Sequence, residues 1–244
     1  MPTTPATPVS PGSQFALTRW SMVLAAGDWR TESHSRRAMD ELARTYWFPL
    51  YAFVRRKGHA PAAAEDLVQA FFTRLLEKDV LLAADPARGK FRSFLLASLK
   101  NFMANAWDKE QAQKRGAGQV FSLQAVDAEA RYRAEPADHM TPERIFERRW
   151  ALAVLDQVLC ALRADYDSRG NAALFAALEP LLVAAAHPPY ATLAAELGMS
   201  EDAVKVAAHR LRRRYRDLLR REIAQTVADP SLIDNEIRDL LSAL

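Results

Sequence analysis

Apolar residues recur three and four positions apart from Phe15 to about Gln113, and alternation of β-branched residues is nearly absent there. This spacing is typical of amphipathic helices, each burying one face. Two segments rich in glycine and proline, 58–61 and 85–89, interrupt the pattern and predict turns. Residues 14–115 are therefore predicted to form a bundle of helices.

The pattern changes between about Gln113 and Met140, where periodicity weakens in a stretch containing Gly and Asp. Thr141 then offers an N-cap and Pro142 a first helical residue, and apolar positions lie on one face to about 164. Residues 172–186 predict a further helix that Pro180 bends or ends. Segment 116–187 is thus predicted to be a partly helical linker between two modules.

The third part of the chain, 188–228, has a helix-turn-helix pattern. Residues 190–197 predict a short helix, Gly198 and Met199 a tight turn, and Ser200 the cap of a second helix. A glycine at the turn can adopt the positive φ that this geometry needs. The segments outside the modules, 1–13 (rich in Pro, Thr and Ser) and 229–244, are predicted to be tails, the first disordered.

The second helix of this pattern is predicted to bury a stripe formed by Val204, Ala208, Leu211, Tyr215 and Leu218. Its remaining surface is strongly basic, with Lys205, Arg210, Arg212, Arg213, Arg214, Arg216, Arg220 and Arg221 against the single acid Asp217. A charge run alone is more often a solvated face. Directly after a helix-turn-helix, it favours DNA binding. The first turns would reach base edges and the later arginines would meet phosphates.

Composition changes this picture little. Half of the 244 residues are apolar, so real cores can be buried, and the net charge of +3 is too mild to indicate a partner by itself. The single cysteine, Cys160, is predicted to be a core residue of a protein in a reducing cytosol. Without a visible signal peptide or an apolar stretch long enough for a bilayer, a soluble cytoplasmic protein without membrane insertion is expected. The sequence offers no clustered histidines, phosphate loop or nucleophile elbow, so neither catalysis nor a cofactor or metal is expected.

Three segments resemble one known family. Residues 64–75, AEDLVQAFFTRL, resemble the polymerase-binding helix of the sigma-70 family, especially its small extracytoplasmic-function branch. Residues 85–95 and 99–105 are similar to the family's turn and promoter-facing segment, and residues 197–210 to its DNA-reading module. The resemblance implies an all-α protein in which a bundle like sigma region 2 and a helix-turn-helix like sigma region 4 are joined by a partly helical linker.

The resemblance also implies a function and its residues. The chain would be a transcription initiation factor, not an enzyme, that binds core RNA polymerase and directs it to promoters. Its partners would be the β′ clamp and β flap of the polymerase, promoter DNA and, as a further option, an anti-sigma factor. The implied polymerase-binding residues are Glu65, Asp66, Gln69, Phe72 and Arg74. Those implied at the −10 element are Arg92, Lys100, Asn101, Asn105, Trp107 and Lys109, and those at the −35 element are Ser200, Lys205, Val206, His209, Arg210 and Arg213.

Alternatives remain open at this point. Aromatic residues at helical spacing are mostly core, so Phe91, Phe94 and Phe102 are expected to be mainly buried and only Trp107 to be exposed to DNA. Asn105 replaces the aspartate of many family members, and Val206 departs from their polar residue. The runner-up function is a sigma-like DNA-binding regulator or interaction protein that does not initiate transcription. Binding to core polymerase would discriminate between the two, and the oligomeric state stays open.

Overall fold

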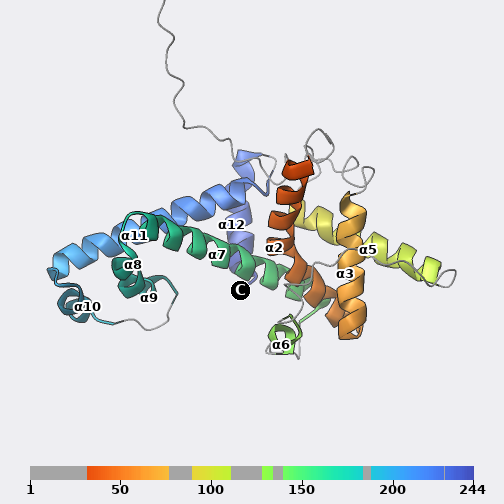
Figure 1. Ribbon diagram of the computed structural model, residues 1–244, viewed down its shortest axis with the longest axis horizontal. Helices are drawn as coiled ribbons and strands as arrows, with labels where there is room; N and C mark the ends of the chain where they lie inside the picture. The colour runs from red at the N-terminus through yellow and green to blue at the C-terminus, as the bar shows by residue number, and fades with distance from the viewer. Residues whose placement is uncertain (1–31, 77–89, 111–127, 134–139, 184–187, 228) are drawn as a thin grey trace, which may run out of the picture.

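The computed structural model describes residues 32–76, 90–110, 128–133, 140–183, 188–227 and 229–244, but not the side chains of 32–39, 41, 76 and 106–110. The predicted tail 1–13 and turn 85–89 lie outside the described residues. The described part is helical and contains no strand, which confirms the all-α prediction (Figure 1). Its helices are α2 (Glu32–Arg56), α3 (Pro61–Leu76), α5 (Phe91–Glu110), α6 (Ala128–Arg133), α7 (Pro142–Ser168), α8 (Ala172–Leu178), α9 (Pro180–Val183), α10 (Tyr190–Leu197), α11 (Glu201–Ala224) and α12 (Ile233–Ser242), with a 3-10 turn η2 at Pro230–Leu232.

The amino-terminal bundle is built on α2, which packs against α3 and, most extensively, against α7. Gly58 adopts a φ of 97° after α2, and α3 begins at Pro61, as the turn signal predicts. The first hydrophobic core lies between these helices and α5. Its largest fully buried side chains include Tyr46, Phe53, Phe71, Phe72 and Phe91.

The longest described helix, α7, starts as the sequence predicts. The Thr141 side chain accepts a hydrogen bond from the backbone N–H of Arg144, and Pro142 occupies the first turn. The helix extends to Ser168, beyond the predicted end near 164. With 27 residues it is about 40 Å long. It begins beside the amino-terminal bundle and ends beside the helix-turn-helix (Figure 1).

The helix-turn-helix is confirmed in its local geometry. Gly198 ends α10 with a φ of 63°, and the Ser200 hydroxyl accepts from the N–H of Ala203 to cap α11. Val204 of α11 is fully buried. The second hydrophobic core joins these helices to α8, α9 and the end of α7, and Pro180 divides the predicted 172–186 helix into α8 and α9.

Both α7 and α11 run through the two cores. Along α7, Trp150 lies in the first core and Leu162 in the second. Along α11, Leu211 lies in the second core and Ile223 in the first. The predicted linker 116–187 therefore contains a helix that builds both modules.

The predicted carboxy-terminal tail contains an ordered helix. The Asp229 side chain caps the 3-10 turn η2, and α12 then packs against α11 and α7. Leu240 is fully buried in the first core, and Glu236 is buried completely although it carries a carboxyl group.

The prediction that Cys160 is a core residue is wrong, because its side chain is exposed. Val158 and Leu162, two positions before and after it, are buried. Two residues turn an α-helix by about 200°, so the buried face of α7 leaves Cys160 on the opposite side.

One carboxylate of the short helix α6 binds two side chains of α2. Glu129 accepts hydrogen bonds from the Tyr51 hydroxyl at 2.8 Å and from the Arg55 guanidinium at 2.9 Å. Chiefly through the bond from Arg55, the pKa of Glu129 is lowered to about 2. Burial and the bond to Glu129 raise the pKa of Tyr51 to about 12.

This carboxylate predicts a pH-dependent contribution to stability. Because the folded pKa of Glu129 lies below its ordinary value of 4.5, the contribution is complete above about pH 4.5 and is lost as the pH falls toward 2. We expect Glu129→Gln to lower the free energy of unfolding by about 1–3 kcal/mol at pH 7. Urea unfolding at several pH values measures this. A deficit that stays constant from pH 7 to pH 3 would contradict it, and the exposed Asp167→Asn is the control.

The shared core predicts that the two modules unfold together. Ile223→Ala removes a fully buried side chain and should lower the free energy of unfolding by about 2–5 kcal/mol. Circular dichroism and tryptophan fluorescence should still report one coincident transition in urea. The exposed Val206→Ala on the same helix should change stability by less than about 0.5 kcal/mol. Two separate transitions in the unmodified protein would show that the modules are independent.

Candidate polymerase and nucleic-acid interface

Helix α3 turns an apolar face to the first core and a polar face to solvent. Asp66 and Arg74 are exposed, whereas Glu65 and Gln69 are half-buried. Phe72, which the resemblance places among the polymerase-binding residues, is only 1% exposed and packs in the core. It can support the helix, but its side chain is not available to a partner on this surface.

Helix α5 likewise divides into two faces. The predicted −10 residues Lys100, Asn101 and Asn105 are exposed on the side away from the core. Trp107 and Lys109 belong to the same helix, but their side chains lie outside the described part. The aromatic prediction holds for Phe91, Phe94 and Phe102, of which the first is fully buried and the other two pack partly buried against the first core.

Lys100 has a carboxylate partner on α7. Its ammonium lies 2.8 Å from Glu143, and both side chains are 43% exposed. The hydrogen bond from Lys100 is the main cause that lowers the pKa of Glu143. Exposed ion pairs contribute only about 0–1 kcal/mol, so a phosphate could replace this carboxylate at little cost.

Arg92 does not lie on the candidate DNA surface. Its side chain is 6% exposed and points into a group of carboxylates, with Glu236 at 2.7 Å. Its guanidinium also stacks on the indole ring of Trp150, with the charged carbon 4.4 Å from the ring centroid. The expectation that Arg92 meets the −10 element is therefore not met in this conformation.

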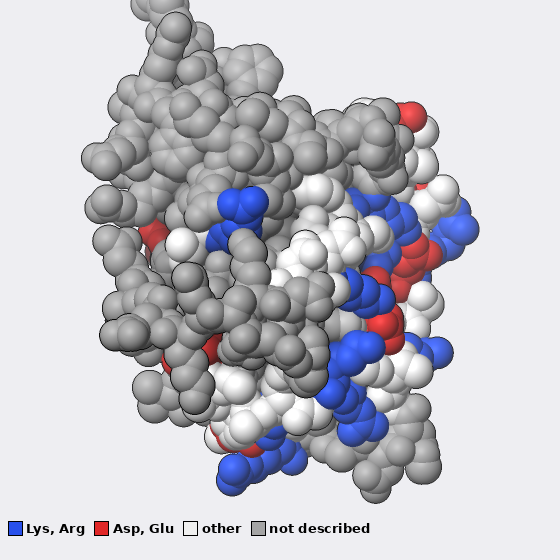
Figure 2. All heavy atoms as spheres, turned by 90° about the vertical axis from the view of Figure 1, so that its right-hand side faces the viewer, with Lys and Arg blue, Asp and Glu red and all other residues white. Residues whose placement is uncertain are grey.

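The described part of the surface at the α3 and α5 end has a mixed charge. Figure 2 shows this end of the molecule, with Lys and Arg side chains in a row along an uncharged area and Asp and Glu side chains among them. A mixed surface of this kind favours specific contacts over general attraction to phosphate.

Helix α11 presents a more uniform basic face. The predicted −35 residues Lys205, Val206, His209, Arg210 and Arg213 are all exposed. The sixth, Ser200, uses its side chain as the helix cap and lies at the amino-terminal end of this face.

Lys205 differs from the others in having two acidic neighbours. Its ammonium lies 3.1 Å from Glu201 and 3.4 Å from Asp202, and the hydrogen bond to Glu201 is the first cause that raises the pKa of Lys205. The amino-terminal turn of α11 therefore carries two acidic side chains against one cation and is not basic.

Tertiary contacts divide the arginines of α11 into two groups. Arg214 pairs with Asp165 of α7 at 2.6 Å, Arg212 donates to the Tyr190 hydroxyl at 3.5 Å, and Arg220 pairs with Asp234 of α12. Within the described part of the chain, no ion pair involves Arg210, Arg213 or Arg216.

The unpaired arginines form one stripe. His209, Arg213 and Arg216 occupy positions i, i+4 and i+7, which share one face of a helix, and Arg210 lies about 100° from His209 beside that face. The sequence-based set omitted Arg216, although its helical spacing could have indicated it. We call these four residues the basic stripe.

The two candidate surfaces lie at opposite ends of the molecule. Figure 1 shows α10 and the beginning of α11 at one end of its longest axis, and α3 and α5 at the other. A single DNA duplex in contact with both would have to follow the length of the protein.

The described residues also lack a metal-binding cluster and a membrane-spanning helix. Among the described residues, no three side chains of His, Cys, Asp or Glu converge as metal ligands would. Among the described helices, none has both the length and the apolar character needed to cross a bilayer.

Comparison with known proteins identifies the amino-terminal bundle. The family model for sigma-70 region 2 matches residues 42–113, which include most of α2, all of α3 and α5. No curated protein and no solved structure matches the chain. Region 2 supports a role in RNA polymerase binding and promoter recognition, with core polymerase and promoter DNA as partners. The chain therefore contains, at residues 42–113, a region 2 of the kind found in sigma-70 RNA polymerase sigma factors.

Proposed function

We propose that this chain is a transcription initiation factor of the extracytoplasmic-function type, which directs core RNA polymerase to promoters through separate contacts with a −10 and a −35 element. One observation carries the proposal beyond region 2. A capped helix-turn-helix with an unpaired basic stripe lies at the end of the molecule opposite α3 and α5. A plain region 2 would have no such second surface.

The proposed polymerase contact lies on α3. Asp66 is exposed to solvent, and Glu65 and Gln69 flank it on neighbouring positions of the helix. Phe72 and Val68 anchor the other face in the core, so the polar face is presented by a rigid element. We assign this face to the β′ clamp of the polymerase.

The proposed −10 contact lies on α5. Lys100, Asn101 and Asn105 provide one cation and two amides, which can bond to phosphates and to the edges of unstacked bases. Trp107 and Lys109 continue this set along the sequence of α5. Arg92 has a structural role here and is left out of the contact.

The proposed −35 contact lies on α11. The first turns of a recognition helix reach base edges in the major groove, which assigns Lys205, Val206 and His209 to base reading. Arg210, Arg213 and Arg216 follow on the same side and are assigned to phosphates. The region 4-like module also provides the proposed contact with the β flap, and an anti-sigma factor could cover either surface.

Transcription with purified components tests this function. Core polymerase plus this chain should start transcripts on promoter DNA that core polymerase alone does not use. If the chain binds DNA but neither binds core polymerase nor supports initiation, the sigma-like regulator is the correct function instead.

Charge reversal on α3 is expected to weaken polymerase binding. Asp66→Arg replaces an exposed carboxylate, so the fold should be unchanged while the affinity for core polymerase falls by about tenfold or more, as for a residue at the centre of an interface. Pull-down and fluorescence anisotropy with core polymerase measure the effect. The matched control is Asp167→Arg, which reverses an exposed carboxylate at the far end of α7. Equal affinity of the two variants would remove α3 from the interface.

Removal of three polar side chains from α11 is expected to weaken promoter binding. Alanine at Lys205, His209 and Arg213 together should lower the affinity of holoenzyme for a promoter. The slope of log affinity against log salt should fall by about one for each phosphate that these side chains no longer neutralise. If Lys205 reads a base, its single alanine variant should cost about 1–3 kcal/mol on the cognate site only.

The control for this triple variant removes three exposed cations from other surfaces. Arg133, Arg163 and Arg169 are 75%, 53% and 54% exposed, and each pairs with a carboxylate on α6 or α7 or at the end of α8, away from the basic stripe. Their triple alanine variant should bind promoter DNA almost as the unmodified chain does. If both triple variants bind with the same reduced affinity, the effect is one of net charge and α11 is not the reading helix.

A further inference from the structure

We propose that the Glu143 carboxylate occupies, in the free chain, a phosphate-binding site formed by Lys57 and Lys100, and that a phosphate of the unpaired promoter strand displaces it when α5 binds DNA. Glu143 is then an internal competitor that sets how strongly this surface binds a strand, and Lys57 is a further contact residue. This inference rests on the proposed function, because it assumes that α5 meets promoter DNA.

The two lysines lie beside the same aromatic ring. Lys57 directly follows α2, and Lys100 lies in the middle of α5. Their ammonium nitrogens are 5.7 and 5.6 Å from the centroid of the Phe53 ring. Because Phe53 is fully buried, both side chains extend over the core while their charged ends remain accessible to solvent. Two cations that are held near one ring attract an anion.

In the free chain this anion is Glu143 of α7. Its carboxylate lies 2.8 Å from the ammonium of Lys100. The hydrogen bond from Lys100 is the main cause that lowers the pKa of Glu143, and the charge of Lys57 also lowers it. Within the described ranges, no ion pair involves Lys57. A phosphodiester carries the same single negative charge as a carboxylate and also has two oxygens that accept hydrogen bonds, so it can take the place of Glu143.

Other contacts hold the backbone around Glu143 in place. The Arg56 guanidinium donates to the carbonyl oxygen of Met140 at 2.9 Å, which joins the end of α2 to the segment before α7. The Thr141 side chain then caps α7. Displacement of Glu143 from Lys100 therefore requires the rotation of one side chain and no movement of the backbone. The released carboxylate stays in the first turn of α7, where the helix dipole favours a negative charge.

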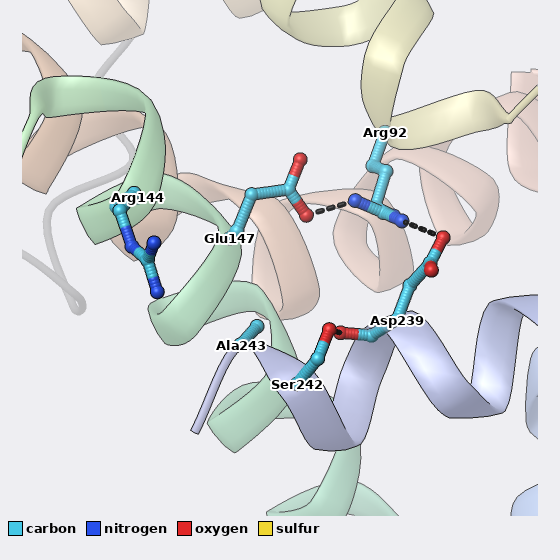
Figure 3. A pocket seen from close by; sticks show the side chains of 6 residues that line it. All are labelled: Arg92, Arg144, Glu147, Asp239, Ser242 and Ala243. Atoms are coloured by element: carbon cyan, nitrogen blue, oxygen red, sulfur yellow. Dashed lines mark hydrogen bonds and ion pairs between the residues drawn. The ribbon is translucent and has the colours of Figure 1, made fainter.

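A second contact aligns α7 with α5. Glu147 lies one turn after Glu143 on the same face of α7 and pairs with Arg92 of α5. Figure 3 shows Arg92 between Glu147 and Asp239 of α12. Arg92 lies about two turns of α5 before Lys100. The alignment of Glu143 with Lys100 thus does not depend on their own ion pair.

The two pairs between α5 and α7 differ in burial. Arg92 is 6% exposed and also binds both carboxylate oxygens of the fully buried Glu236, with N–O distances of 2.7 and 3.0 Å. A buried charge that loses its partner is strongly destabilising, so this contact is permanent. Lys100 and Glu143 are both 43% exposed, and water can solvate either of them when the pair opens. Only the second pair is suited to exchange with DNA.

Internal competition has a consequence for selectivity. It lowers the affinity for every strand by the same factor, because phosphates carry no base information. Asn101 and Asn105, the proposed base contacts on α5, are exposed and lie outside the ion pair. A larger share of the net binding free energy then comes from base contacts.

Strand binding by the full chain tests the competition. The probe is fluorescein-labelled oligo(dT) of about 20 nucleotides, measured by anisotropy, because phosphate contacts need no particular sequence. Glu143→Gln removes the charge with little change of size and should raise the affinity about two- to fivefold, the range of an exposed ion pair. Lys57→Ala and Lys100→Ala should each lower the affinity and reduce the salt slope by about 0.7. The control is Asp40→Asn, an exposed carboxylate about 20 Å along α2 from Phe53, which should leave the affinity unchanged.

A double substitution separates competition from simple repulsion. If Glu143 acts by holding Lys100, the gain from Glu143→Gln should largely disappear in a Lys100→Ala background. A gain that persists in this background would show that Glu143 only repels phosphate, and the proposal would be overturned. The absence of any gain in the otherwise unmodified chain would overturn it as well.

Annealing the probe to oligo(dA) distinguishes an unpaired strand from a duplex. The proposed contact on α5 involves unstacked bases, so the gain from Glu143→Gln should be larger on the single strand than on the duplex. An equal gain on both probes would overturn the assignment of the site to an unpaired strand.

Holoenzyme distinguishes a failure of this proposal from a failure of the proposed function. On a promoter that the holoenzyme transcribes, Glu143→Gln should lengthen the half-life of the promoter complex, whereas Lys57→Ala and Lys100→Ala should shorten it. If the lysine variants shorten it and Glu143→Gln has no effect, the −10 contact stands and the competition is wrong. If neither lysine variant changes strand binding or initiation, α5 is not the −10 surface, and the proposed function fails at this contact as well.

Discussion

The structure depends on the continuity of two helices, α7 and α11, through both hydrophobic cores. Each contributes buried residues to the region 2 bundle at one end and to the helix-turn-helix at the other. Because an α-helix resists bending unless its hydrogen bonds are broken, these helices fix the two modules relative to each other. Tyr215 and Leu218 of α11 pack against both cores, so no boundary free of contacts separates them. Under this constraint the protein acts as one body with a candidate DNA surface at either end.

The sequence predicts features that are determined by neighbouring residues. The cap at Thr141, the positive φ of Gly198 and the cap at Ser200 depend on residues within one helical turn, and all three are present. Prediction from the sequence fails where a contact joins residues that are far apart in the chain. Arg92 is 144 positions from Glu236, and nothing near either residue indicates that they meet. The same limit explains why the sequence indicated neither α12 within the predicted tail nor the packing of the predicted linker helix, α7, in both cores.

The arginines of α11 illustrate the difference within one helix. By composition they form a single basic run, and helical spacing alone divides them into faces. The partners that commit Arg214 and Arg220 belong to α7 and α12, so the sequence cannot separate these arginines from Arg210, Arg213 and Arg216. Tertiary carboxylates thus narrow the basic surface of α11, because they commit Arg214 and Arg220 to α7 and α12. A narrower row of cations favours a defined orientation on the phosphate backbone over attraction in many orientations.

The use of charge at the start of α5 has a physical reason of its own. A buried ion pair commonly contributes no more stability than well-packed apolar residues of the same volume, so stability alone does not explain the cluster around Arg92. The cluster instead fixes the orientation of the helices that it joins. Apolar contacts tolerate small rotations, whereas a guanidinium that binds two oxygens of Glu236 and stacks on Trp150 is satisfied in one geometry only. Since Lys100, Asn101 and Asn105 lie on the same helix as Arg92, the rotation that this cluster fixes is also the rotation that aims the proposed −10 residues.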